Sequence, residues 1–178
     1  MLLMPQRDWQ WIYNDTYGVL SVSLGLDMEF LTPYKSKALI PDALATMEFS
    51  VEHARFYIDF IERLGKSITV SDALKVQLSL NATAAHFMLK PQMPKSWYFD
   101  SSAVCVYSEL AKVFQLRCQS VDVQVMVVES NIQSSLVMLL SPELALTDSK
   151  SLRQFDCIKV MNDRLQPLKI SRHKSAAA

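Results

Sequence analysis

Residues 89–99, Leu-Lys-Pro-Gln-Met-Pro-Lys-Ser-Trp-Tyr-Phe, separate two regions of the chain that have different hydrophobic patterns. Pro91 and Pro94 end any preceding helix and favour an extended backbone. Before this stretch the apolar residues recur with a period of two and then at helical spacing, and after it they return to a period of two or to short runs. We therefore expect an α+β fold, with an N-terminal domain over residues 1–92 and a C-terminal domain over residues 93–178.

The N-terminal domain is expected to begin with an antiparallel meander, because residues 9–31 alternate between apolar and polar. Turn residues at 14–18 and at Gly25 separate the three expected strands, and a loop is expected around Pro33 and Pro41. The apolar positions of the three expected strands are Trp9, Trp11 and Tyr13, then Leu20, Val22 and Leu24, then Leu26, Met28 and Phe30. This spacing predicts that one face of the meander is buried.

Two helices are expected after the meander. Ser50 is a good N-cap for the first, and Gly65 is expected to end it. Thr69 and Asp72 resemble a capping box for the second, which Pro91 ends. The expected core-facing residues are Val51, Ala54, Ile58, Ile61 and Leu64 in the first helix, and Leu74, Leu78, Ala82, Ala85 and Leu89 in the second.

The C-terminal domain is expected to be a small β-barrel or sandwich. Short apolar runs separated by turn residues, with no helical pattern between them, favour strands. The candidate strands are residues 103–107, 121–129, 136–140, 157–161 and 168–170.

Charge and glycine content limit the function classes. Lys plus Arg number 18 and Asp plus Glu also number 18, so the net charge is zero, which argues against nucleic-acid binding. The chain has 3 glycines, too few and too scattered for a dinucleotide fingerprint or a phosphate-binding loop. Residues 1–149 hold 11 basic and 16 acidic side chains, whereas residues 150–178 hold 7 and 2. The C-terminal segment therefore suits an acidic peptide.

No constellation of residues predicts catalysis or a cofactor. The 3 cysteines include no closely spaced pair, which argues against a disulfide framework or a zinc site. His53, His86 and His173 stand outside any catalytic motif, and we expect them to be structural or surface residues. No leader sequence and no apolar run of membrane-spanning length is present, so we expect a cytoplasmic protein that needs no membrane, metal or cofactor.

The stretch between the domains combines cations with aromatic residues. Lys90 and Lys95 project from an extended backbone, and Trp97 and Phe99 follow them. Cations beside aromatic side chains are favoured in protein interfaces. A stiff linker whose aromatic residues begin the β core explains the same residues equally well, and both interpretations stay open at this point.

The same stretch resembles a known family. Residues 89–97, LKPQMPKSW, are similar to a motif of the ZapC family of Z-ring-associated cell division proteins. VVES at residues 127–130, and IKVMNDRL at residues 158–165 followed by Pro167, support the resemblance. The stretches WQWIY at residues 9–13 and LNA at residues 80–82 also fit the family pattern. Residues 100–120 and 141–156 match no family pattern.

This resemblance implies a monomer with an N-terminal α/β domain and a C-terminal twisted β-barrel-like domain. It implies no enzymatic activity. It also implies binding to the tubulin-like GTPase FtsZ, lateral bundling of FtsZ protofilaments, and stabilisation of the Z ring at midcell. A pocket on each domain is implied as well, the C-terminal one with an apolar centre and a basic rim. The positions on matching motifs, which we expect to bind FtsZ, are Lys90, Lys95, Trp97, Lys159 and Arg164.

Two other function classes stay open on the residues alone. A small cytosolic enzyme would need acid–base groups in a cleft, and no spacing in the sequence predicts them. A nucleic-acid-binding barrel would use Lys90, Lys95, Trp97 and the basic C-terminal segment to stack on single strands. The zero net charge argues against the second class.

Overall fold

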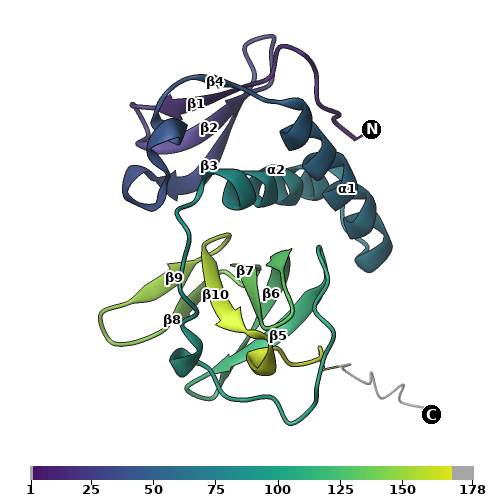
Figure 1. Cartoon of the computed structure of the whole chain (residues 1–178), viewed down its shortest axis with the longest axis vertical. Coiled ribbons are helices and arrows are strands. Elements are labelled where there is room, and N and C mark those ends of the chain that lie inside the picture. Colours follow the sequence, from purple (N-terminus) through teal and green to yellow (C-terminus); the bar gives the residue numbers. More distant parts are fainter. Residues whose placement is uncertain (1, 170–178) are drawn as a thin grey trace, which may run out of the picture.

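The computed structural model describes residues 2–169. Its N-terminal sheet has the order β3-β2-β1-β4, and the C-terminal sheet has the order β10-β7-β6-β5 (Figure 1). Two long helices lie with the N-terminal sheet, so the predicted α+β class is confirmed. Neither helix is long and apolar enough to cross a membrane, and the same holds for every helix of residues 2–169.

The meander forms as the alternation predicts. β1 (Gln10–Asn14), β2 (Val19–Ser23) and β3 (Glu29–Lys35) are antiparallel neighbours, and β4 (Met47–Glu48) pairs with the other edge of β1. Four side chains on one face of β1 and β2 are buried, namely Trp9, Trp11, Leu20 and Val22. This face packs on the helices.

The third strand differs from the prediction. Leu26 and Asp27 adopt positive φ angles of 48° and 59° in the turn before it, and Leu26 is 97% exposed. β3 therefore starts later than expected and buries Thr32 and Tyr34 instead of Leu26 and Met28. Pro33, expected in a loop, lies inside β3. An edge strand tolerates proline because one side of its backbone needs no ladder partner.

Helix α1 (Val51–Ser67) starts at Ser50 as predicted, and the Ser50 side chain accepts a hydrogen bond from His53 N at 3.2 Å. The buried stripe, however, is His53, Tyr57, Phe60, Ile61 and Leu64. Val51 is 76% exposed, and Ala54 and Ile58 are half-buried, so this part of the predicted core face points outward. Gly65 does not end the helix, which continues to Ser67.

The imidazole of His53 completes the N-terminus of α1. Its Nδ1 accepts hydrogen bonds from Ser50 N and from Trp11 Nε1, each at 3.0 Å. Burial lowers the pKa of His53 below its usual value, which keeps Nδ1 free to accept both donors. A structural role for this histidine is thus supported by its contacts.

Helix α2 (Asp72–Met88) lies between the two sheets, as Figure 1 shows. Ser71 caps it by accepting a hydrogen bond from Leu74 N, in place of the expected Thr69. All residues from Leu78 to Ala85 are buried, because one side faces the meander and the other faces β6. Ser79 and Thr83 donate to the carbonyl oxygens of residues 75 and 79, each at 2.7 Å, so their hydroxyls are satisfied within the helix.

The C-terminal strands are β5 (Val113–Cys118), β6 (Val121–Ser130), β7 (Ser134–Leu139), β8 (Glu143–Ala145), β9 (Ser151–Arg153) and β10 (Cys157–Met161). The predicted strands at residues 121–129, 136–140 and 157–161 are confirmed. The sequence reasoning missed β5, β8 and β9. The prediction of a strand at residues 103–107 is wrong, and residues 168 and 169 form no strand, while residue 170 lies outside the described residues.

The C-terminal sheet is barrel-like without closing into a full barrel. After β10 the chain passes a short 3-10 turn (Asn162–Arg164) and meets the free edge of β5. Gln115 and Gln166 exchange two backbone hydrogen bonds there, of 2.8 and 2.9 Å. This single bridge joins the first and last parts of the sheet.

The two halves share one hydrophobic core. The core of α1, α2 and the meander continues into Met126, Val128, Leu136 and Met138 on one face of the C-terminal sheet, while a second core fills the other face. We call the boundary between the two halves the seam. The Tyr34 hydroxyl donates across it to Phe155 O at 2.8 Å. The domain division at residues 92 and 93 stays a prediction.

Candidate functional site

Residues 89–99, which we call the linker, are held by hydrogen bonds along the outer edge of β10. Lys95 N donates to Lys159 O at 2.8 Å, and Met161 N donates to the Ser96 side chain at 2.9 Å. Gln92 adds a side-chain hydrogen bond to Cys157 O at 3.4 Å. The prolines prevent this segment from continuing α2, and these bonds hold it beside the strand.

Side chains of the linker alternate between the interior and solvent. Met93, Lys95 and Trp97 are exposed, whereas Pro94 and Ser96 between them are half-buried. Met93 is 81% exposed and Trp97 is 70% exposed. We call Met93, Lys95 and Trp97 the linker ridge. The sequence reasoning singled out Lys95 and Trp97 but missed Met93, which the period of two from Trp97 would have indicated.

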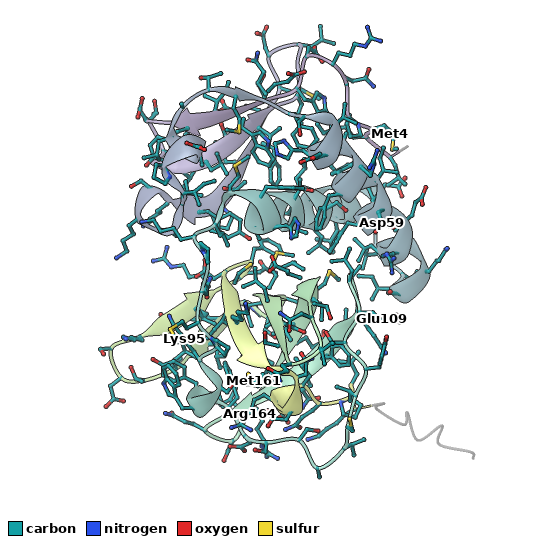
Figure 2. All side chains as sticks on the ribbon, viewed as in Figure 1. Met4, Asp59, Lys95, Glu109, Met161 and Arg164 are labelled. Atoms are coloured by element: carbon teal, nitrogen blue, oxygen red, sulfur yellow. The ribbon has the colours of Figure 1, made fainter. Side chains whose placement is uncertain are left out.

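Arg164 lies next to the linker and holds it in place. Its guanidinium donates to Ser96 O at 3.1 Å and to the Ser101 hydroxyl at 2.6 Å, and it contacts Asp163 at 3.2 Å. Figure 2 shows Lys95, Met161 and Arg164 together on the C-terminal half. The donors of Arg164 are therefore largely engaged within the chain.

Lys90 and Lys159 line a cavity of about 180 Å³ at the seam between the halves, together with His86 and Glu129. His86 Nδ1 lies 3.1 Å from a Glu129 oxygen, and the His86 ring stacks on Phe56 with 4.5 Å between centroids. Lys90 also donates to Lys37 O at 3.0 Å. This cavity holds two lysines against one carboxylate.

The five predicted site residues thus divide into three groups. Lys95 and Trp97 lie on the linker ridge, whereas Lys90 and Lys159 line the cavity between the halves, which we call the seam cavity. Arg164 holds the linker in place by hydrogen bonds within the chain. A larger hollow of about 660 Å³ lies nearby, over residues 102, 104–108, 130–132 and 162–163, and among residues 2–169 no Lys, Arg or His lines it. Within residues 2–169 no group of His, Cys, Asp and Glu could hold a metal ion.

Comparison with known proteins identifies the family. A family model described as cell-division protein ZapC, N-terminal, matches residues 2–90, and one described as cell-division protein ZapC, C-terminal, matches residues 91–171. The chain belongs to the ZapC family. The two ZapC matches meet inside the linker, directly after Lys90.

Relatives named cell division protein ZapC match along the whole chain. That of Shewanella woodyi is 74% identical over 177 residues, which cover 99% of this chain and 98% of its own. That of Shewanella oneidensis is 62% identical over 177 residues, with 99% and 100% covered. That of Aeromonas hydrophila is 33% identical over 172 residues, with 97% and 96% covered. The resemblance predicted from the linker motif is confirmed, and with it a role in cell division.

Proposed function

We propose that this ZapC family member binds FtsZ, promotes lateral bundling of FtsZ protofilaments and stabilises the Z ring. It acts in the cytoplasm as a monomer, is recruited to midcell, and has no catalytic activity of its own. The partner follows from the family resemblance. The contact that we assign to it follows from the geometry of the linker ridge.

The linker ridge is the observation that carries the proposal. Two large apolar side chains, Met93 and Trp97, stand exposed on either side of Lys95 on a backbone that is fixed to β10. Exposed tryptophan beside a cation is typical of binding hot spots, since the ring supplies area and the cation selects the partner. Such a ridge suits a short peptide that mixes apolar and acidic residues.

The seam cavity extends the basic character of this surface. Lys159 shares a backbone hydrogen bond with Lys95, and Lys90 starts the linker. Because these lysines outnumber the one cavity carboxylate, Glu129, they favour an acidic ligand passing from the ridge towards the seam. Ordering a flexible peptide consumes part of the interaction energy, so we expect each contact to be weak.

Bundling requires a second contact, and the outer face of α1 is the candidate. Val51, Ala54 and Ile58 line an apolar hollow of about 380 Å³, with Arg55, Asp59 and Glu62 around it. The shared core fixes this face relative to the linker ridge. Many sites lie side by side on a filament, so two weak contacts held at a fixed spacing would act by avidity.

Co-sedimentation with FtsZ polymers in GTP, at moderate and high salt, tests the proposal. The wild-type chain should enter the pellet and increase it, and salt should weaken the effect. Lys95→Glu and Trp97→Ala should each weaken binding by roughly tenfold, the loss expected for a hot-spot residue. Lys150→Glu in the β8–β9 turn is the matched control, because it makes the same charge change at an exposed lysine that belongs to neither the linker ridge nor the seam cavity.

Val51→Glu separates binding from bundling. It should leave binding to single filaments unchanged while reducing the pellet, since only the second contact is lost. Normal pelleting by both ridge variants would exclude the linker ridge as the contact. If the wild-type chain stays in the supernatant while FtsZ polymerises normally, FtsZ binding itself is excluded for this chain.

A further inference from the structure

Residues 103–107 have the composition of a strand but no strand partner. They read Ala-Val-Cys-Val-Tyr, which is why the sequence predicted a strand there. Within residues 2–169, the backbone N–H groups of residues 105–108 donate to no acceptor. In Figure 2 Glu109, two residues after this segment, lies on the C-terminal half close to the end of α1. Unpaired backbone donors beside apolar side chains are a template for pairing.

The hollow beside this segment is apolar and roomy. It has a volume of about 660 Å³ and lies between residues 102–108, the β6–β7 turn and the 3-10 turn after β10. Three of its apolar side chains are largely exposed: Val104 at 56%, Tyr107 at 75% and Ile132 at 98%. A cluster of exposed apolar side chains around a hollow is typical of a binding groove.

The walls of this groove are held by internal hydrogen bonds. Asn162 donates to Asn131 O at 3.0 Å and to Ile132 O at 3.2 Å, and its side-chain oxygen accepts from the Ser135 hydroxyl at 2.6 Å. Ser130 donates to Ser108 O at 3.1 Å. Since these side chains already have partners, the groups left to recognise a ligand are backbone N–H groups and apolar side chains, together with the Cys105 thiol and the Tyr107 hydroxyl.

We propose that this groove binds an extended, aliphatic peptide of a partner protein by strand addition. The peptide pairs with the backbone N–H groups of residues 105–107 and places alternate side chains between Tyr107 and Ile132. Apolar side chains dominate the lining, and its one carboxylate, Asp163, is paired with Arg164 at 3.2 Å, so the groove selects its peptide by apolar side chains and not by charge. This chemistry differs from that of the linker ridge, and the site does not depend on FtsZ binding.

Hydrogen exchange of the free protein tests the premise. The amides of Cys105, Val106 and Tyr107 should exchange fast, as unpaired groups do, whereas the paired amides of β6 should be protected. Strong protection of residues 105–107 in the free chain would overturn the proposal.

A random decapeptide library displayed on phage and selected on the full chain tests the ligand class. The selected peptides should be aliphatic at alternate positions. A synthetic copy of a selected peptide should slow exchange at residues 105–107 by more than tenfold. Failure to enrich any peptide, or enrichment of peptides that lack aliphatic residues at alternate positions, would overturn the proposal.

Point variants locate the selected peptide. Cys105→Pro removes one N–H that has no partner within residues 2–169, and Ile132→Asp places a charge at a position that is 98% exposed. Each should weaken binding more than tenfold, while Cys105→Ala should change it less than twofold. Lys95→Glu should also leave it unchanged. Circular dichroism checks the fold, and undiminished binding by the folded Ile132→Asp chain would contradict the site.

Discussion

Tyr34→Phe removes a hydrogen bond that joins the two halves of the molecule. The Tyr34 side chain lies in β3, is 4% exposed, and donates to Phe155 O at 2.8 Å. Its hydroxyl also lies 3.4 Å from the Cys157 sulfur. Burial raises the pKa of Tyr34 well above its usual value, so the phenol stays protonated and keeps its donor.

The expected cost follows from what the substitution leaves behind. Phenylalanine fills the same space, so no cavity forms apart from the lost oxygen, and the change isolates the hydrogen bond. A net hydrogen bond contributes about 0.5–1.5 kcal/mol, and the loss grows because Phe155 O keeps, within residues 2–169, only the weak Cys157 thiol as a donor at 3.9 Å. We expect the free energy of unfolding to fall by about 1–2 kcal/mol. For a chain of 178 residues this lowers Tm by roughly 2–8 °C.

Urea denaturation measures this difference. Fluorescence of Trp9 and Trp11 reports the N-terminal half, and amide exchange in β6 and β7 reports the C-terminal sheet. Because the halves share a core, both probes should shift to the same lower midpoint. Tyr17→Phe is the control, since Tyr17 is 67% exposed and should unfold as the wild type does. Equal midpoints for the two variants would refute a stabilising seam bond.

Three further stability predictions follow from the N-terminal half. Burial lowers the pKa of His53, so on acidification the unfolded chain binds a proton at this ring before the folded chain does. The free energy of unfolding should therefore fall as the pH drops below about 6.5, by at most about 1.4 kcal/mol per pH unit. An NMR titration of the folded chain should give His53 a pKa below the usual histidine value. Ser50→Ala should cost about 1 kcal/mol in urea denaturation, because α1 loses its cap. Gly65→Ala should stabilise by about 0.5–1 kcal/mol, since Gly65 lies within α1 with open space around it, whereas Gly25→Ala should destabilise because its φ is +76°. Equal melting temperatures for the two glycine variants would contradict this backbone argument.

The first two strands of the meander and the N-cap of α1 could be predicted because they depend on neighbours in the sequence. Alternation over residues 9–23 decides which side chains of β1 and β2 share a face, and Ser50 caps α1 through its own side chain. The linker motif likewise indicated the family from local residues. The start of the third strand was mispredicted because the turn at Leu26 and Asp27 delays it, and alternation alone does not determine where a turn ends.

Periodicity shows which residues of a helix share a face, but not which face another element will cover. Val51 and Ile58 fit the helical stripe of α1, yet the buried stripe is turned toward Tyr57 and Phe60. The residues of α2 from Leu78 to Ala85 are buried on all sides because a second sheet, distant in the sequence, packs against them. These choices depend on which surfaces meet.

The candidate site shows the same division. By itself the sequence determined the extended linker, its cations and its tryptophan, because proline restricts the backbone wherever it stands. Only the tertiary structure decided that Arg164 is engaged internally, that Met93 joins Lys95 and Trp97 on one exposed ridge, and that residues 103–107 form no strand. A segment forms a strand only if another strand pairs with it, and a side chain is exposed only if no other segment covers it. Segments far away in the chain decide both.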